Sequence, residues 1–496
     1  MSHIMAIDQG TSSSRVIIFD TQGRVIGAVA HEFDMTFPAD GWVEQNPEVL
    51  WRTTLAAGRD ALEQAGLSGS DIAAIGITNQ RETTLVWDRQ SGRPLHPAIV
   101  WQDRRTAERC QVMLEDGMAQ TVSRTTGLVI DPYFSATKLA WLLDEVPGIR
   151  HLAEAGKVCF GTVDAFLIWR LTKGARHVTD ASNASRTQLF DIDAQTWSRE
   201  LLRYFSIPAS LLPDVLDSAA DFGVADPEWF GAAIPIFGVA GDQQAALIGQ
   251  ACFSTGMAKS TYGTGCFAML NTGATRIHSR QRLLTTVAYR LDGSTTYALE
   301  GSIFSAGVAV KWLRDQLGLV TSARETEAAA RRTGGDTRGV YLVPAFTGLG
   351  APHWAPAARG LLSGLTLDTN RDHLITATLA SVAYQSAELV DAMAADGVAL
   401  AGLRVDGGMV VNDWLCQFLA DIIDLPVERP VNIETTALGA AVLAALGAGL
   451  AGDFSEATAM WQLDQEFRPA MAVLERDRLL GGWRRAVART LLDPRV

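Results

Sequence analysis

A run of small and hydroxyl-bearing residues near the start of the chain has the composition of a phosphate-binding turn. It reads Asp-Gln-Gly-Thr-Ser-Ser-Ser-Arg over residues 8–15 and lies between two short apolar runs that predict strands. Small side chains let backbone N–H groups converge on an anion, and Arg15 adds a fixed positive charge. Asp8 supplies a carboxylate that can hold Mg2+, usually through its waters. The pattern predicts a site for phosphate and magnesium, with a polar β-hairpin as the alternative.

Polar and aromatic side chains also follow other predicted strands. Arg81 and Glu82 come after the strand at residues 73–78, Trp101 ends the strand at residues 97–101, and Asp242 comes after the strand at residues 235–241. Open α/β sheets bind ligands at the carboxyl ends of their strands, so these residues are candidates for a binding site. Each has a structural alternative. Asp242 is a favoured helix N-cap, the Arg81–Glu82 pair could be an ordinary surface ion pair, and Trp101 could be a core aromatic.

Positioning these side chains needs alternating strands and helices, which predict a mixed α/β sheet. The predicted strands cover residues 4–7, 16–19, 25–29, 73–78, 85–87, 97–101, 235–241, 257–262, 266–271, 340–344 and 403–406. The predicted helices cover residues 47–65, 135–143, 162–171, 245–249, 371–393, 412–422 and 436–450. Residues 179–189, rich in Ser, Thr and Asn, are expected to form a polar connection.

The second half of the chain repeats the opening pattern of strand, Gly/Thr turn and strand, with the turn at residues 263–265. A length of 496 residues fits roughly three domains or two large ones. We place the boundary near residue 250, which gives domains at residues 1–250 and 251–496. No low-complexity linker divides them, so we expect the two halves to share a deep cleft.

Composition excludes several classes of protein. A net charge of −13 argues against general nucleic-acid binding, which needs a basic surface. The five cysteines form no C-x-x-C pair, a pattern typical of a reduced, cytoplasmic protein. The longest apolar stretch, residues 437–452, is rich in glycine and predicts a buried helix rather than a membrane span. We therefore expect a soluble protein.

Eight motifs in family order resemble the glycerol-phosphorylating members of the FGGY sugar-kinase family, and they span nearly the whole chain. They lie at residues 8–15, 79–84, 99–105, 127–134, 241–244, 262–267, 344–354 and 405–408. The resemblance implies two actin-like (ribonuclease H-like) α/β domains with mixed β-sheets flanked by helices. It also implies ATP and Mg2+ in the cleft between them, and transfer of the γ-phosphoryl group to glycerol to give sn-glycerol 3-phosphate. Members of the family also suggest a homo-oligomer, either a dimer or a tetramer.

The resemblance implies roles residue by residue. Asp242 would accept the proton of the attacking hydroxyl, and Asp8 and Asp242 would hold Mg2+. The implied glycerol pocket comprises Arg81, Glu82, Trp101, Tyr133, Asp242, Gln243 and Phe267. The implied ATP-binding residues are Thr11, Ser12, Ser13, Arg15, Thr264, Gly307, Lys311, Gly408 and Asn412. A triol has three hydroxyls and a short carbon edge, so a pocket of donors, acceptors and aromatic walls suits it.

Two departures from the family pattern bear on function. Lys311 stands where the family usually has Gln. Residues 216–234 contain no Lys or Arg, whereas some bacterial relatives carry a basic, Gly-rich loop there that binds fructose 1,6-bisphosphate as an inhibitor. Three other functions stay open on the residues alone. They are a kinase for another polyol or a pentulose, an actin-like ATPase without a small substrate, and a binding module without catalysis.

Overall fold

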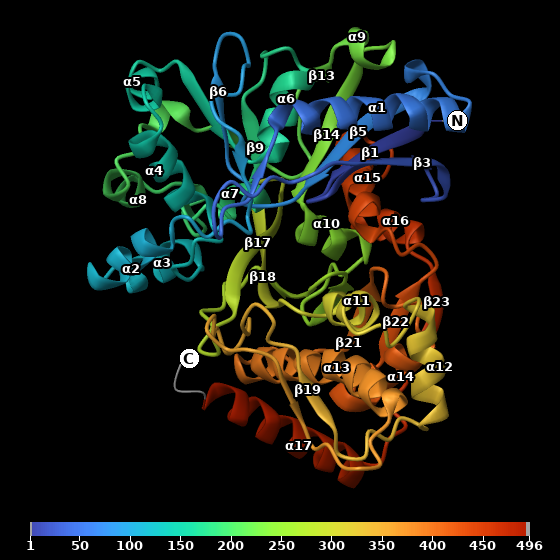
Figure 1. Cartoon of the computed structure of the whole chain (residues 1–496). Coiled ribbons are helices and arrows are strands. Elements are labelled where there is room, and N and C mark those ends of the chain that lie inside the picture. Colours follow the sequence, from blue (N-terminus) through green and yellow to red (C-terminus); the bar gives the residue numbers. More distant parts are fainter. Residues whose placement is uncertain (1, 493–496) are drawn as a thin grey trace.

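The first half of the chain is built on a six-stranded mixed sheet, which lies in the upper part of Figure 1. The computed structural model describes residues 2–492. In the order β13-β14-β5-β1-β2-β3, neighbours among β1, β2 and β3 are antiparallel, whereas β5 and β14 run parallel to β1. The bounds are β1 His3–Gln9, β2 Ser13–Asp20, β3 Val25–Glu32, β5 Ile72–Asn79, β13 Val224–Ala225 and β14 Ile234–Gly241.

The second half repeats this arrangement in a seven-stranded sheet of order β17-β18-β16-β15-β21-β22-β23. An antiparallel hairpin, β15–β16, again opens the sheet, and β21 runs parallel to β15. The bounds are β15 Met257–Tyr262, β16 Cys266–Gly273, β17 Leu284–Leu291, β18 Ser294–Ile303, β21 Gly402–Asp406, β22 Val427–Pro430 and β23 Leu463–Phe467. Because each sheet starts with a hairpin, a Gly/Thr turn follows the first strand in both halves, as the sequence predicts.

Five two-stranded pairs complete the strands of residues 2–492: β4–β7, β6–β8, β9–β12, β10–β11 and β19–β20. Their bounds are β4 Glu44–Gln45, β6 Leu85–Asp88, β7 Ala98–Ile99, β8 Val158–Gly161, β9 Val178–Asp180, β10 Phe190–Asp191, β11 Thr196–Trp197, β12 Asp214–Leu216, β19 Tyr341–Val343 and β20 Leu361–Ser363. The pair β6–β8 brings the strand after the Arg81–Glu82 turn against a later segment of the same half.

Helices cover both sheets. In the first half they are α1 Pro47–Ala65, α2 Ala107–Glu115, α3 Ala119–Thr126, α4 Ser135–Glu145, α5 Ile149–Glu154, α6 Val163–Leu171, α7 Ala181–Ser185, α8 Arg199–Tyr204, α9 Pro227–Phe230 and α10 Asp242–Gly249. In the second half they are α11 Gly307–Asp315, α12 Arg324–Arg332, α13 Arg371–Ala395, α14 Asp413–Ile423, α15 Thr435–Gly447, α16 Phe454–Ala457 and α17 Val473–Leu491. Short 3-10 turns lie at Gly69–Asp71, Ala209–Leu211 and Thr458–Met460.

Helix α1 shows how local signals set an element's ends. The Asn46 side chain accepts a hydrogen bond from the backbone N–H of Glu48, and Pro47 occupies the first helical position. Gly66 ends the helix in the left-handed conformation, which glycine adopts without steric penalty. The predicted helix at residues 47–65 is therefore confirmed at both ends.

Helices α10 and α15 pack closely against each other where the two halves meet. A Cβ atom on Gly249 would lie 1.9 Å from the carbonyl oxygen of Thr435, and one on Gly439 would lie 1.8 Å from that of Ala245. Only glycine permits this approach. Helix α15 also packs on β1, β5 and β14, so a helix late in the chain lies beside the first sheet in Figure 1. The division of the chain at residue 250 stays a prediction.

The predicted apolar helix at residues 436–450 is confirmed as α15, and most of its residues are buried. Within residues 2–492, none of the helices has the length and apolarity needed to span a membrane. All five cysteines are unpaired and buried.

Two predicted segments differ from the structure. The helix expected at residues 245–249 begins earlier, at Asp242, with Gly241 as its N-cap residue, so Asp242 is not the N-cap that the sequence left open. Residues 179–189 hold the short helix α7 and are buried rather than forming a plain polar connection. Asp180 makes this possible, since its carboxylate accepts hydrogen bonds from the backbone N–H groups of Ser182 and Asn183.

Candidate functional site

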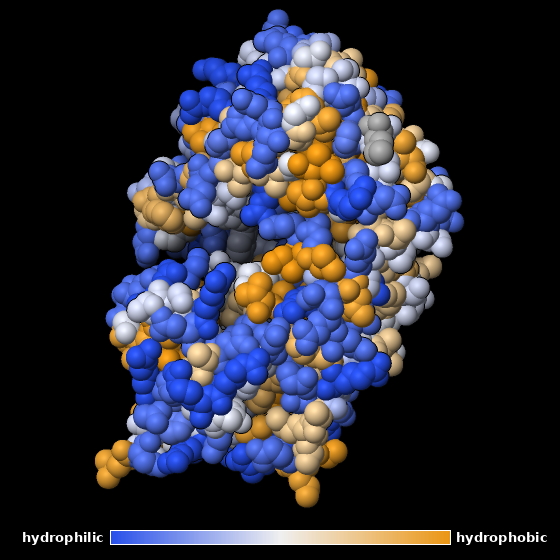
Figure 2. Space-filling model, turned by 90° about the vertical axis from the view of Figure 1, so that its right-hand side faces the viewer, coloured by the Kyte–Doolittle hydropathy of each residue, from blue (hydrophilic) through white to orange (hydrophobic). Residues whose placement is uncertain are grey.

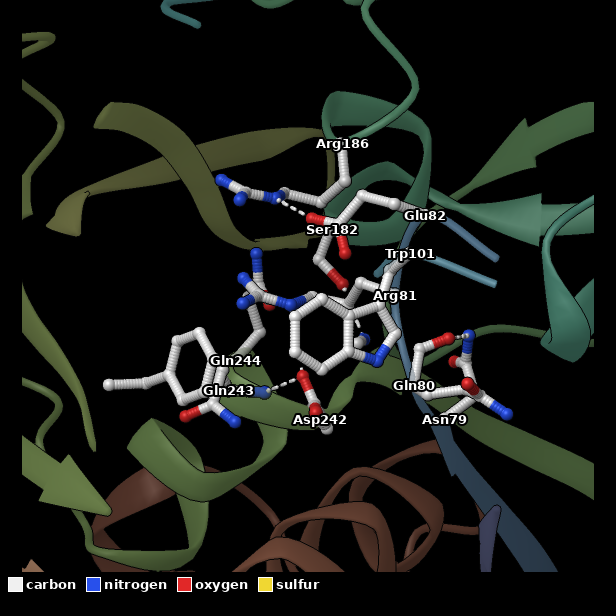
Figure 3. A network of polar contacts seen from close by, with 12 residues as sticks. Asn79, Gln80, Arg81, Glu82, Trp101, Ser182, Arg186, Asp242, Gln243 and Gln244 are labelled. Atoms are coloured by element: carbon white, nitrogen blue, oxygen red, sulfur yellow. Dashed lines mark hydrogen bonds and ion pairs between the residues drawn. The ribbon is translucent and has the colours of Figure 1, made fainter. Parts of the chain in front are cut away.

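Arg81 lies at the centre of a network of polar contacts at the end of β5 (Figure 3). Its Nε atom lies 2.9 Å from Oδ1 of Asp242, the first residue of α10. Its Nη1 and Nη2 atoms both donate to the carboxylate of Glu300, which comes from β18 in the second half. Arg81 is 3% exposed and Glu300 is fully buried. Burial alone would raise the pKa of Glu300, but Arg186 and Arg81 outweigh burial and hold it at about 2.

Glu82 lies in a strained backbone position beside Arg81. Its φ of 60° is unusual for a residue with a side chain, and its carbonyl oxygen accepts from the Ser135 hydroxyl at 3.0 Å. Its Oε1 atom accepts from Nε of the buried Arg186 at 2.7 Å. Burial raises the pKa of Glu82, and the charges of Arg186 and Arg81 oppose that rise. The pair Arg81–Glu82 is therefore buried, which excludes the surface ion pair left open by the sequence.

Three aromatic side chains pack edge to face beside these charges. The ring centroids of Trp101 and Tyr133 are 5.6 Å apart, and those of Trp101 and Phe267 are 6.4 Å apart. The indole N–H of Trp101 donates to the Thr11 hydroxyl at 2.9 Å, which joins the aromatic group to the first turn. Burial raises the pKa of Tyr133 well above its ordinary value, so its hydroxyl stays protonated. The predicted aromatic residues therefore lie together.

Gln243 is held by a buried lysine. Lys259 on β15 donates to the Gln243 side-chain oxygen, to the Thr261 hydroxyl at 3.0 Å and to the Phe267 carbonyl oxygen at 3.2 Å. Burial lowers the pKa of Lys259, against the attraction of Asp406 and Asp242. A residue of the second sheet thus fixes two of the predicted pocket residues, Gln243 and Phe267.

The first turn, between β1 and β2, is exposed at Ser12 and half-buried at Thr11 and Ser13. Its backbone closes through a hydrogen bond from the Gly10 N–H to the Ser13 carbonyl oxygen at 2.9 Å. Arg15 forms an ion pair with Glu434, which precedes α15, so its charge is partly neutralised by the second half.

Asp8 lies near the end of β1, one residue before Gln9, and is the candidate metal ligand of this turn. Burial raises its pKa to about 7; Arg15 opposes this rise, and the carboxylates of Asp242 and Glu434 add to it. Within residues 2–492, no three His, Cys, Asp or Glu side chains are placed to hold a metal ion together. Asp8 and Asp242 therefore fit Mg2+ only in the way it often binds beside phosphates, through one or two carboxylates, waters and phosphate oxygens.

A cavity of about 660 Å3 opens beside the second turn. Five predicted nucleotide-binding residues line it: Thr264, Gly307, Lys311, Gly408 and Asn412. The backbone N–H groups of Ala306 and Val308 donate to the Thr264 carbonyl oxygen at 3.0 Å, which fixes the turn against the start of α11. Apolar side chains in the lining, such as Val310 and Leu379, suit a base, and Lys311 and Arg324 suit its polar groups.

Most of the predicted residues therefore fall into two groups. One joins Arg81, Glu82, Trp101, Tyr133, Asp242, Gln243, Phe267 and Thr11 through direct contacts or shared partners, and the other lines the cavity. Ser12, Ser13 and Arg15 do not line that cavity. Figure 2 shows the surface hollowed at mid-height, between the upper and lower parts of the molecule.

Three functional candidates were missed by reasoning from the sequence: Arg186, Glu300 and Lys259. Arg186 lies within the segment at residues 179–189 that the sequence predicts to be a polar connection, and Glu300 precedes the glycine that leads toward α11. Each is a charged residue among buried ones, which is a weak signal by itself. Their partners lie between 16 and 219 residues away along the chain, so no local spacing shows them.

The sequence matches the two family models of the FGGY family of carbohydrate kinases, the N-terminal domain over residues 3–249 and the C-terminal domain over residues 258–448. A glycerol kinase of Rhodospirillum centenum is 60% identical over 487 residues, which is 98% of each chain. Glycerol kinase 1 of Pseudomonas aeruginosa is 59% identical over 490 residues, which is 99% of each chain.

Solved structures show the same fold. Plasmodium falciparum glycerol kinase with ADP superimposes with a TM-score of 0.92 at 36% identity and covers 99% of both chains. A ligand-bound xylulose kinase from Lactobacillus acidophilus has a TM-score of 0.87 at 21% identity, covering 98% of this chain and 99% of that one. The predicted fold class, actin-like α/β with mixed sheets flanked by helices, is confirmed.

Proposed function

Because the chain belongs to the FGGY family of carbohydrate kinases, we propose that it transfers the γ-phosphoryl group of ATP to glycerol and forms sn-glycerol 3-phosphate. Relatives between 56% and 60% identical over nearly the full length carry the name glycerol kinase, which supports this substrate. The observation that carries the proposal is the Arg81–Asp242 contact beside Trp101, Tyr133 and Phe267. It places charged side chains beside aromatic rings, the combination that a small polyol needs.

Glycerol would bind through its hydroxyls and its short carbon edge. Arg81 would donate to one hydroxyl, and Glu82 and Asp242 would accept from others. The aromatic rings would cover the CH groups, which otherwise remain in contact with water. A pentulose has more carbons and more hydroxyls, so these same residues would leave some of its hydroxyls without a hydrogen-bond partner.

Phosphoryl transfer needs positioning and charge neutralisation more than covalent chemistry, because its transition state is loose. Asp242 would accept the proton of the attacking hydroxyl through Oδ2, since Oδ1 already faces Arg81 at 2.9 Å and the Gln243 N–H at 2.7 Å. Backbone N–H groups and hydroxyls of the two turns would steady the phosphate oxygens. Mg2+, held by Asp8 and Asp242, would supply positive charge at those oxygens.

The nucleoside of ATP would lie in the cavity lined by Gly307, Lys311, Gly408 and Asn412. Thr264, in the second turn, lines the same cavity and would contact the phosphates. This arrangement would put the γ-phosphate between the two turns, facing the Asp242 side chain.

A substrate panel tests this function. Initial rates with ATP would be measured for glycerol, dihydroxyacetone, xylulose, gluconate and erythritol. We expect the largest kcat/KM for glycerol. A larger value for a pentulose or for gluconate would contradict the proposed substrate, and ATP consumption that does not depend on any polyol would favour the actin-like ATPase alternative.

A further inference from the structure

Four charged side chains form a continuous buried chain behind the pocket, in the order Arg81, Glu300, Arg186 and Glu82. Glu300 Oε1 accepts from Arg81 Nη2 at 3.2 Å and from Arg186 Nη2 at 3.1 Å, and Arg186 Nε donates to Glu82 at 2.7 Å. All four are at most 3% exposed. In the view of Figure 3, Arg186 and Glu82 lie on one side of Arg81, and Asp242 lies on the other side.

We propose that Glu300 and Arg186 are positioning residues for the polyol pocket, which keep one N–H of Arg81 and one oxygen of Glu82 available to substrate hydroxyls. This inference rests on the proposed function. It adds two residues to the site that do not themselves touch the substrate.

A count of hydrogen-bonding groups leads to this assignment. A guanidinium has five N–H groups in a rigid plane. In Arg81, the Nε–H faces Asp242, the two on Nη1 reach Glu300 and Gln244 (3.3 Å), and one on Nη2 reaches Glu300. One N–H on Nη2 remains. In Glu82, Oε1 is taken by Arg186, and Oε2 accepts no hydrogen bond from residues 2–492.

The two arginines and two glutamates of this buried network carry two positive and two negative charges. This balance depends on Glu300. Removing its charge would leave two arginines close together in a buried site, which is strongly unfavourable. Arg186 Nη1 has no hydrogen-bond partner in the described part of the chain. The Arg186 guanidinium instead lies 5.8 Å from the Tyr133 ring and 5.5 Å from the Phe134 ring, so cation–π attraction fixes its orientation.

Glu300 belongs to the second sheet, whereas Arg81, Glu82 and Arg186 belong to the first half. The pocket's donor is therefore oriented by a strand of the opposite half. A merely structural ion network would change stability without favouring one substrate over the other. A positioning network would change the affinity for the polyol and leave the affinity for ATP nearly unchanged.

The test compares Glu300→Gln, Arg186→Lys and the charge-neutral double variant Arg186→Gln/Glu300→Gln with the wild type. We expect the glycerol KM to rise about tenfold to hundredfold in Glu300→Gln and in the double variant, and less in Arg186→Lys, which keeps the charge. The ATP KM should stay within about threefold, because the network does not line the nucleotide cavity. ADP binding and thermal unfolding would be measured on the same samples.

Arg170→Gln is the matched control. Arg170 also pairs with a carboxylate, Glu48, and lies 5.1 Å from an aromatic ring, Phe166, but it packs between α1 and α6 away from the pocket. It should lower stability and leave both KM values unchanged.

Each outcome decides the inference. A folded Glu300→Gln or double variant with an unchanged glycerol KM would overturn it, and so would equal rises in the KM of glycerol and ATP. Loss of folding in the charge-neutral double variant would also overturn it, because the network would then be required for folding rather than for positioning the pocket residues. A wild type that does not phosphorylate glycerol would overturn the proposed function first, which separates that failure from the others.

Discussion

Replacing Asp242 by Asn tests the proposed proton acceptor with little change in shape. Oδ1 of Asp242 lies 2.9 Å from Arg81 Nε and accepts a hydrogen bond from the Gln243 N–H at 2.7 Å. The side-chain oxygen of an asparagine can make both of these contacts. The Asn nitrogen would replace Oδ2 and cannot accept a proton. A general base contributes on the order of 10²- to 10⁴-fold in rate, so we expect kcat to fall by that factor.

The assay measures ADP release in a coupled reaction at saturating glycerol and ATP, with ADP affinity determined separately by calorimetry. We expect the ADP affinity to change by less than about threefold, since nothing in the cavity is altered. Asp226→Asn is the control, because Asp226 also lies at the start of a helix, α9, where it accepts from the Glu228 N–H. It should leave kcat unchanged. An Asp242→Asn enzyme with kcat within threefold of the wild type would show that Asp242 only begins α10, and the mechanism would be wrong.

Three further predictions follow from other parts of the structure. Arg81→Ala or Glu82→Gln should raise the glycerol KM by roughly 5- to 150-fold, from a loss of about 1–3 kcal/mol in a buried pocket, with the ATP KM nearly unchanged; steady-state kinetics with equal shifts in both would contradict this. Burial lowers the pKa of His177 to about 4, so the unfolded chain binds a proton below about pH 6.5 and the folded protein does not until about pH 4. Stability should fall by about 3 kcal/mol as the pH drops through that window, and melting curves of His177→Gln should depend less on pH than those of the wild type; identical pH dependence would refute the assignment. Fructose 1,6-bisphosphate should inhibit weakly or not at all, and saturable inhibition at millimolar bisphosphate, measured with salt-matched controls, would reveal a site that residues 216–234 do not provide.

The structure adds a reason for the last prediction. Cations from elsewhere do reach residues 216–234, but they already have partners. Arg290 pairs with Asp217, and Lys173 lies 3.1 Å from Asp226 and 2.8 Å from Glu228. An added phosphate would have to displace these carboxylates from Arg290 and Lys173. Arg59 and Arg176 also reach this segment, where they donate to the backbone carbonyl oxygens of Trp229, Glu228 and Asp221.

Much of the fold could be predicted because its signals are local. The helix at residues 47–65 has a cap, a proline and a terminal glycine in sequence, and the Gly/Thr turns separate clear apolar strands. The strand ends at Arg81 and Asp242 could be predicted for the same reason. The sequence does not predict which of the two sheets a helix packs against. Helix α15 packs on the first sheet through the close approach of Gly439 to Ala245 on α10, and nothing near Gly439 in sequence indicates this.

The candidate site shows the same limit. Trp101, Tyr133 and Phe267 could be proposed individually from their motifs, but their mutual contacts, such as that of Trp101 with Phe267 in the other half, exist only in the folded chain. Glu300 and Lys259 could not, because their roles depend on partners in the opposite half of the chain. A buried charge becomes interpretable only when its counter-charge is placed, since burial without a partner is unfavourable.

Product identification tests the central claim most directly. The protein would be incubated with ATP, Mg2+ and glycerol, and phosphorus NMR with a stereospecific dehydrogenase would identify the product. We expect one ADP for each sn-glycerol 3-phosphate formed, and no ATP consumption when glycerol is omitted. Phosphate release without a phosphorylated polyol, or phosphate on the other terminal carbon of glycerol, would contradict this expectation.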